Sequence, residues 1–256
     1  MSGRQPDAGQ RLEDVSGRRT PCLGVAGLVL GALAAASAVM AGIGTRLGVW
    51  DFRTGLGILK WSAYLALGAS ILCLAALAAG FAGKIRRGAL LPLVGLLLAL
   101  PAIALPWRMW STARRVPAIH DITTDTENPP RFVAVLPLRA GAANPSAYGG
   151  PEIAEKQRFA YPDVRPAIVP VPPAEAYDRA LAAARRLGWR IVDGNAADGR
   201  IEATDTTFWF GFKDDVVIRI VPAGGGSRVD VRSVSRVGKS DVGTNAARIR
   251  KFLASL

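Results

Sequence analysis

Three long stretches of this sequence contain no charged residue, and an Arg or Lys bounds each of them. They are residues 20–45, 61–83 and 88–107. A helix of about 20 apolar residues is long enough to cross the hydrocarbon core of a bilayer, which is about 30 Å thick. The sequence therefore predicts three transmembrane helices, at about Leu23–Gly44, Ser62–Ala82 and Ala89–Pro106.

The predicted spans divide the chain into four regions. They are a polar N-terminal tail at residues 1–22, a transmembrane region at 23–110, a proline-rich linker or strap at 111–164, and a soluble domain at 165–256. The spans contain no ionisable side chain other than Cys and Tyr. Ion and proton pathways usually require buried charges, so we expect an anchor rather than a channel or transporter.

Small residues and cysteines add detail to the membrane region. Gly27 and Gly31 are four residues apart, a spacing that lets helices approach closely. We expect them to form a packing face within the three-helix bundle, with self-association of the chain as the alternative. Cys22 and Cys73 both lie in or beside the spans, so we expect no disulfide framework and no Cys-based zinc site in the soluble domain. We also expect no cofactor.

The basic charge of the chain is concentrated near the membrane. Residues 1–110 carry 11 basic and 4 acidic side chains, a net charge of +7 out of the total of +12. A nucleic-acid-binding protein would carry a basic stripe on its soluble part, so we exclude that partner. The numbers of basic residues that flank the spans are nearly equal on the two sides of the membrane. The dense basic turn Lys84–Arg87 nevertheless favours an N-terminus on the cytoplasmic side. We therefore expect a multi-pass protein of the bacterial inner membrane, with the soluble domain in the periplasm.

The proline-rich segment has little apolar periodicity. Pairs such as Asn128-Pro129 and Asn144-Pro145 indicate turns. The acidic, Thr-rich run Asp121–Glu127 follows His120, but one His with scattered carboxylates is not the spacing of a metal site. We expect this run to be a solvated loop.

The soluble domain has the pattern of a small α+β fold. The expected strands are Ala167–Val171, Trp189–Asp193, Arg200–Phe208, Asp215–Val221 and Arg228–Arg236, and the expected helices are Ala174–Leu187 and a last one from about Val242. This β-α-β-β-β-β-α order predicts an antiparallel sheet with both helices on one face. Val229 and Val231 alternate with Arg228, Asp230 and Arg232, so one face is apolar. The opposite, charged face is expected to be solvated or bound by a partner.

The passage from the last strand to the last helix is unusually rich in polar residues. The candidate site comprises Asp214, Asp215, Arg232, Ser233, Ser235, Arg236, Asp241, Asn245 and Arg248. Asp241 or Ser240 is suited to cap the helix, and Asn245, Arg248 and Phe252 follow Asp241 at helical spacing.

Three hypotheses fit these residues. The first is a structural network of ion pairs and caps that docks the last helix. The second is an anion- or ligand-binding site whose donors are Arg232, Arg236 and the helix N-terminus. The third is a hydrolase or lipid-modifying centre that uses the Asp214-Asp215 pair, because paired Asp residues can hold a metal or share a proton. No nucleophile–base pair and no histidine supports the third, and we expect neither catalytic residues nor a metal.

The same passage carries a family resemblance. Phe212-Lys213-Asp214-Asp215-Val216, followed by Arg232–Gly238, Ser240–Gly243, Asn245 and Arg248-Ile249, resembles the domain of unknown function 1499 family over about residues 116–256. Many bacterial members are similar to this chain in having apolar spans before the domain. The resemblance implies the fold and family membership but no reaction. Other members often have a Cys near the domain start, where this chain has His120 and Asp121.

A run of aromatic residues, Phe208-Trp209-Phe210-Gly211-Phe212, is the last conspicuous feature. We expect core and edge packing, or insertion into the membrane interface if the run is exposed on a loop. Together these features predict an integral membrane protein that presents a non-enzymatic binding or scaffolding domain. Its expected partner is the lipid bilayer, with a protein or an anionic ligand as the candidate partner of the soluble domain.

Overall fold

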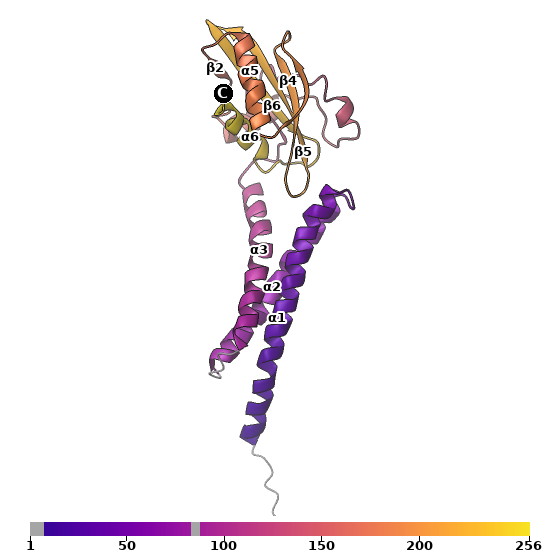
Figure 1. Cartoon of the computed structure of the whole chain (residues 1–256), viewed down its shortest axis with the longest axis vertical. Coiled ribbons are helices and arrows are strands. Elements are labelled where there is room, and N and C mark those ends of the chain that lie inside the picture. The colour runs from indigo at the N-terminus through magenta and orange to yellow at the C-terminus, as the bar shows by residue number, and fades with distance from the viewer. Residues whose placement is uncertain (1–7, 83–87) are drawn as a thin grey trace, which may run out of the picture. The chain divides into compact units, whose positions relative to one another are not determined.

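The computed structural model describes residues 8–82 and 88–256 (Figure 1). The chain forms two compact units that divide between Met109 and Trp110, and each is considered by itself. The turn Lys84–Arg87, on which the predicted orientation depends, lies outside the described residues.

The first unit contains three long helices, and the last residues of the third, from Trp110 on, belong to the second unit. The three helices are α1 (Ala8–Arg46), α2 (Phe52–Ala82) and α3 (Leu90–Ala113). Their segments Cys22–Arg46, Phe52–Phe81 and Leu90–Ala113 are long and apolar enough to cross a membrane, as predicted. Helix α2 begins ten residues before the expected span, because the Asp51 carboxylate accepts the N–H groups of Arg53 and Thr54 and so caps its first turn. The uncharged run marked the apolar part of this helix and not its start.

Glycines allow the three helices of the first unit to pack closely. A Cβ added at Gly27 would lie 2.5 Å from the Cys73 sulfur on α2, and one added at Gly31 would lie 2.7 Å from the Gly95 carbonyl oxygen on α3. Both distances are too short for any side chain. The two glycines therefore form a packing face within the bundle, which is the first of the two predicted uses.

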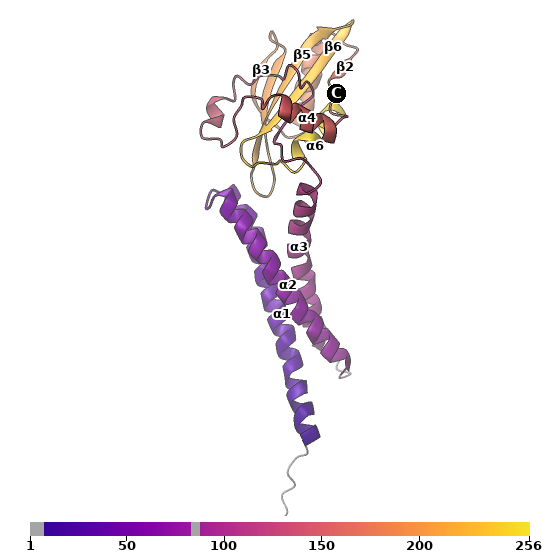
Figure 2. The same ribbon diagram turned by 180° about the vertical axis from the view of Figure 1, so that it is seen from behind.

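The second unit is an antiparallel sheet with helices (Figures 1 and 2). Its strands are β1 (Asp121–Thr123), β2 (Ala167–Val169), β3 (Arg190–Asn195), β4 (Arg200–Thr206), β5 (Lys213–Ala223) and β6 (Gly226–Ser235). Its helices are the short η2 (Pro137–Arg139), α4 (Pro151–Ala160), α5 (Pro173–Arg186) and α6 (Thr244–Leu253). The strand order is β1-β6-β5-β4-β3, and β2 also pairs with β6. The predicted α+β class with an antiparallel sheet is confirmed.

Part of the proline-rich segment, which was predicted as a linker or strap, contributes a strand to this sheet. Strand β1 pairs with the end of β6, with Asp121 opposite Val234 and Thr123 opposite Arg232. Helix α4 follows, and its Gln157 side chain is hydrogen-bonded to both backbone groups of Thr123. A three-residue strand with two polar members carries too little periodicity to be recognised in the sequence.

The apolar face of the sheet is covered by α5 and α6, as predicted. Its side chains come from alternate positions, including Ile201, Val216, Ile218, Val229 and Val231. Ala180 of α5 and Phe252 of α6 are buried against them, and the Phe252 ring stacks on Trp189 at 5.3 Å. We call this side of the sheet the helix face.

The opposite face is covered by residues 124–148, which we call the strap. Phe132 and Val135 of the strap pack on Val217 and Val234. On this side Glu202, Asp215 and Asp230 have no exposed surface. The prediction that this face is solvated or bound by a partner is therefore wrong for the central strands, since the strap of the same chain covers it. We call it the strap face.

Candidate functional site: two ion-pair networks and a pocket

The residues predicted as one site lie on both faces of the sheet. Asp215, Arg232 and Arg236 point to the strap face, whereas Asp214, Ser233 and Ser235 point to the helix face, where Asp241, Asn245 and Arg248 also lie. Successive side chains of a strand point to opposite sides, so neighbours in sequence are separated by the sheet itself. The nine residues form two networks instead of one.

The network on the helix face docks α6 on the sheet. The guanidinium of Arg248 donates to Asp214 at 2.6 Å, to Asp205 at 2.7 Å and to the Ser233 hydroxyl at 3.1 Å. Asn245 accepts a hydrogen bond from Ser233 at 2.7 Å. Arg248 and Asn245 are buried together with Phe252, as their helical spacing predicted. This arrangement matches the structural network among the three hypotheses.

Asp241 caps α6 from two residues before the helix-capping position, Gly243. Its carboxylate accepts the N–H groups of Gly243 and Asn245, each at 2.8 Å. Burial raises the pKa of the Asp241 carboxyl, and these two hydrogen bonds oppose the rise. Because Asp241 occupies the N–H groups at this helix end, they are not open to an external anion.

Asp215 is the centre of the network on the strap face. Its carboxylate receives hydrogen bonds from Arg139 at 2.6 Å, from Thr204 at 2.7 Å, and from two nitrogens of Arg236 at 2.8 and 2.9 Å. Burial by itself would raise the pKa of the Asp215 carboxyl, but the hydrogen bonds from Arg236, Thr204 and Arg139 outweigh it. The pKa therefore lies below its ordinary value.

Arg232 forms a second ion pair on the strap face. Its Nε and Nη2 atoms donate to the two oxygens of Asp121 at 2.9 and 2.7 Å, and its remaining bonds go to the carbonyls of Pro130 and Ser146. Only 3% of the Arg232 side chain is exposed. The expectation that the run from Asp121 is a solvated loop is wrong at Asp121, Thr123 and Thr124, which are buried.

Sequence reasoning missed several members of these networks. They are Asp121, Arg139, Glu202, Thr204 and Asp205. Arg139 lies 76 residues from Asp215, and Asp121 lies 111 residues from Arg232, so no local pattern joins the partners. The alternation of Asp121, Ile122 and Thr123 was the one readable indication, because it matches a strand with a polar and an apolar side.

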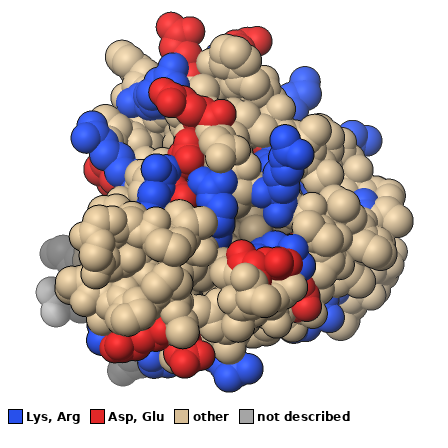
Figure 3. Space-filling model, turned by 90° about the horizontal axis from the view of Figure 1, so that it is seen from above, with Lys and Arg blue, Asp and Glu red and all other residues tan. Residues whose placement is uncertain are grey.

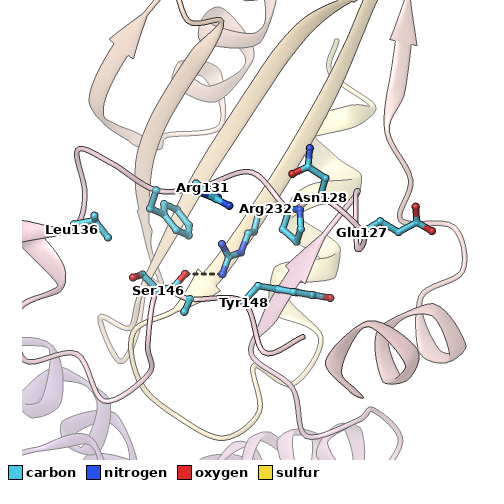
Figure 4. A pocket seen from close by; sticks show the side chains of 10 residues that line it. Glu127, Asn128, Arg131, Leu136, Ser146, Tyr148 and Arg232 are labelled. Carbon is cyan, nitrogen blue, oxygen red and sulfur yellow. Dashed lines mark hydrogen bonds between the residues drawn. The ribbon is translucent and has the colours of Figure 1, made fainter. Parts of the chain in front are cut away.

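A pocket of about 460 Å³ lies between the strap and Arg232 (Figure 4). Its lining residues are Glu127, Asn128, Pro129, Arg131, Phe132, Leu136, Ser146, Ala147, Tyr148 and Arg232. The Arg232 guanidinium lies 5.2 Å from the Phe132 ring centre and 5.5 Å from that of Tyr148. Burial raises the pKa of Tyr148 to about 12, and the Asp121 charge adds to this, so the phenol is neutral at physiological pH.

The geometry bears on each chemical hypothesis. Asp214 and Asp215 point to opposite faces and are each paired with Arg, so they share neither a proton nor a metal. Among the residues that the structure describes, no three His, Cys, Asp or Glu side chains gather closely enough to hold a metal ion. Arg232 and Arg236 are likewise separated by the sheet from the N-terminus of α6, so the anion site as predicted is not assembled.

The sequence comparisons agree with the extent of the second unit. Residues 121–256 match the family described as protein of unknown function (DUF1499). No curated protein and no solved structure matches the chain. The match begins at β1 and ends at the last residue, so it includes the strap, both networks and the pocket. Since it spans more than half of the sequence, the chain belongs to the DUF1499 family of proteins of unknown function.

Proposed function

We propose that this chain is a multi-pass protein of the bacterial inner membrane that presents a non-enzymatic binding domain on the periplasmic side. Three helices apolar enough to cross a membrane support the anchoring. Two networks whose charges are paired within the chain support a structural rather than a catalytic use of the buried Asp and Arg residues. In the view of Figure 3, acidic and basic side chains are interspersed, without the basic stripe that nucleic acid would require.

The pocket beside Arg232 is the observation that carries the proposed binding function. Its volume of about 460 Å³ lies in the range of sites for small organic ligands. Phe132, Tyr148 and Leu136 offer apolar surface, and the exposed Arg131 on its wall offers a cation. Glu127 is the one acidic residue of the lining. A ligand with an aromatic body and a carboxylate fits these groups, because the body contacts the rings and the carboxylate pairs with Arg131.

The lipid-modifying or hydrolytic alternative would need a reacting pair in one place. The Asp214 carboxylate faces away from Asp215, because adjacent residues of a strand point to opposite faces, and it is paired with Arg248 on the helix face. Asp215 is surrounded by three hydrogen-bonding side chains, Arg139, Thr204 and Arg236. A binding domain needs no such pair, so the geometry favours it.

Saturation-transfer NMR with benzoate and naphthoate tests this function on the full chain in nanodiscs. Ala147→Trp fills the pocket from an exposed lining position, whereas Ala143→Trp places the same bulk at an exposed strap position outside the lining. We expect transfer to the aromatic carboxylates in the wild type and in Ala143→Trp, and its loss in Ala147→Trp. Equal transfer in all three proteins would refute the assignment of the pocket.

The proposed side of the membrane has its own test. A phosphatase that is active only in the periplasm, fused after Leu256, is expected to be active. An inactive phosphatase, together with an active cytoplasmic reporter at the same position, would contradict the periplasmic placement while leaving the binding function open to its own measurement.

A further inference from the structure

The aromatic run lies at the end of the sheet where the chain enters the second unit. We call residues Thr207–Phe212 the aromatic loop; it joins β4 to β5, and Thr206 pairs with Lys213 at its base. In the strand register, Asp214 of β5 lies opposite Ser235 of β6. The preceding residue of β6, Val234, lies opposite Asp121, the first residue of β1. The aromatic loop and the entry of the chain into β1 therefore share one end of the sheet.

The chain between α3 and β1 is short. Seven residues separate Ala113, the last residue of α3, from Asp121. The Cα atoms of Ala113 and Asp121 are eight positions apart, so a fully extended chain would separate them by at most about 29 Å. Covalent geometry alone thus limits the distance of this sheet end from the last residue of a helix that is apolar enough to cross a membrane.

The aromatic loop has a defined structure that exposes one ring. The Thr207 N–H donates to the Phe212 carbonyl at 2.8 Å, and the Phe212 N–H donates to the Thr207 hydroxyl at 2.9 Å. Phe210 is buried and stacks on Phe212 at 5.4 Å, while Trp209 contacts Phe210 edge-on. Phe208 is 92% exposed. Phe210 therefore shows the predicted core packing, and the exposure of Phe208 on a loop meets the condition on which the predicted membrane insertion depends.

Basic side chains accompany this ring. Lys213 follows the aromatic loop directly, Lys239 lies in the segment after β6, and both are exposed. Arg114 and Arg115 are exposed in the segment between α3 and β1. The opposite end of the sheet differs, because its turns, residues 196–199 and 224–225, contain only Ala, Asp and Gly. Aromatic rings and basic residues together are typical of surfaces that contact the headgroup region of anionic bilayers.

We propose that the aromatic loop inserts Phe208 into the interface of the anionic bilayer in which the chain is anchored, with Lys213 and Lys239 contacting lipid phosphates. This surface is separate from the pocket at Arg232, since none of the pocket-lining residues belongs to the aromatic loop. A lipid surface is favoured over a protein partner because the ring and the lysines lie at the tethered end of the sheet.

Photo-crosslinking of the full-length protein in vesicles of phosphatidylethanolamine and phosphatidylglycerol tests the proposal. p-Benzoylphenylalanine replaces Phe208 in one protein and Ile168 in a matched control. Ile168 is 66% exposed, but in the strand register it lies opposite Arg228, in the half of β6 that is away from the aromatic loop. We expect phospholipid adducts several-fold more abundant from position 208 than from position 168. Equal yields, or adducts from position 208 with protein only, would overturn the proposal.

A second comparison tests the role of the lysines. In the protein labelled at position 208, Lys213→Glu combined with Lys239→Glu is expected to reduce the lipid adducts in the same vesicles and to leave them unchanged in phosphatidylcholine vesicles. Unchanged yields in the phosphatidylglycerol-containing vesicles would overturn the assignment of anionic lipid as the partner.

Discussion

Replacing the Asp215 carboxylate by an amide is expected to destabilise the second unit strongly. Asp215→Asn preserves shape and removes the negative charge that faces Arg139 and Arg236. The Arg139 side chain is only 4% exposed and that of Arg236 14%, so neither cation gains full hydration in compensation. Removing one member of a buried ion pair typically costs about 3–5 kcal/mol. We expect a loss in that range, because two guanidinium groups lose their shared counterion.

Native-state hydrogen exchange measured by mass spectrometry reports this loss for the second unit within the full chain. Some amides of β5 and β6 exchange only when the whole unit opens. For these amides, a loss of about 3–5 kcal/mol corresponds to exchange that is faster by roughly two to three and a half orders of magnitude. Asp163→Asn is the matched control, because Asp163 pairs with Arg250 while both side chains are about half exposed. Exposed pairs contribute about 1 kcal/mol or less.

Two outcomes decide the interpretation of the network. If Asp215→Asn accelerated exchange no more than Asp163→Asn, the buried carboxylate would not stabilise the fold and the structural assignment would be refuted. Arg139→Met added to Asp215→Asn removes the more deeply buried cation, so we expect the double variant to recover part of the lost stability. A further loss in the double variant would contradict the idea that an unpaired charge is the cause.

The remaining predictions concern pH and the membrane helices. The pKa of Asp215 is lower in the folded than in the unfolded chain, so its stabilisation is present above the ordinary value of about 4 and is lost as the pH falls through the lower folded value. After correction for intrinsic exchange rates, the difference in amide exchange rate between wild type and Asp215→Asn should therefore be the same at pH 5 and pH 7. A difference that is already smaller at pH 5 would contradict a lowered pKa of Asp215 in the folded chain. In the bundle, Gly27→Val should cost about 1–3 kcal/mol by overpacking against Cys73, whereas Gly68→Val, with no heavy atom within 4 Å of its Cβ, should change little. Thermal aggregation in detergent compares the two, and equal midpoints would disprove the packing role of Gly27.

Several parts of the fold could be predicted because their causes are local. The apolar alternation of β6 at Val229 and Val231 specified the helix face, and the spacing of Asn245, Arg248 and Phe252 specified the buried side of α6. The proline-rich segment was predicted as a linker or strap, but the face of the sheet that the strap covers could not be predicted in the same way. The strap covers the sheet through contacts such as the Glu202 carboxylate with the N–H groups of Val133 and Val135, which lie 69 and 67 residues away in the sequence.

The sequence predicted nine residues of the two networks, but not their arrangement and not partners such as Arg139 and Thr204. All nine residues take part in ion pairs or hydrogen bonds, yet the sheet divides them. Strand parity alone is sufficient to separate Asp214 from Asp215 and Arg232 from Ser233, since adjacent strand residues point to opposite sides. The pocket had no sequence pattern at all, because its walls come from two parts of the strap and from β6.

The sequence by itself determined the three apolar helices, the antiparallel α+β class and the side of β6 that faces the helices. Lipid and a protein core both select for composition and periodicity within one segment, so these properties can be read locally. Only the tertiary structure decided which charges are paired, that the strap buries the polar face, and that a pocket opens beside Arg232. A buried charge takes whichever partner the fold brings within reach, and for Asp121 and Arg232 that partner lies 111 residues away.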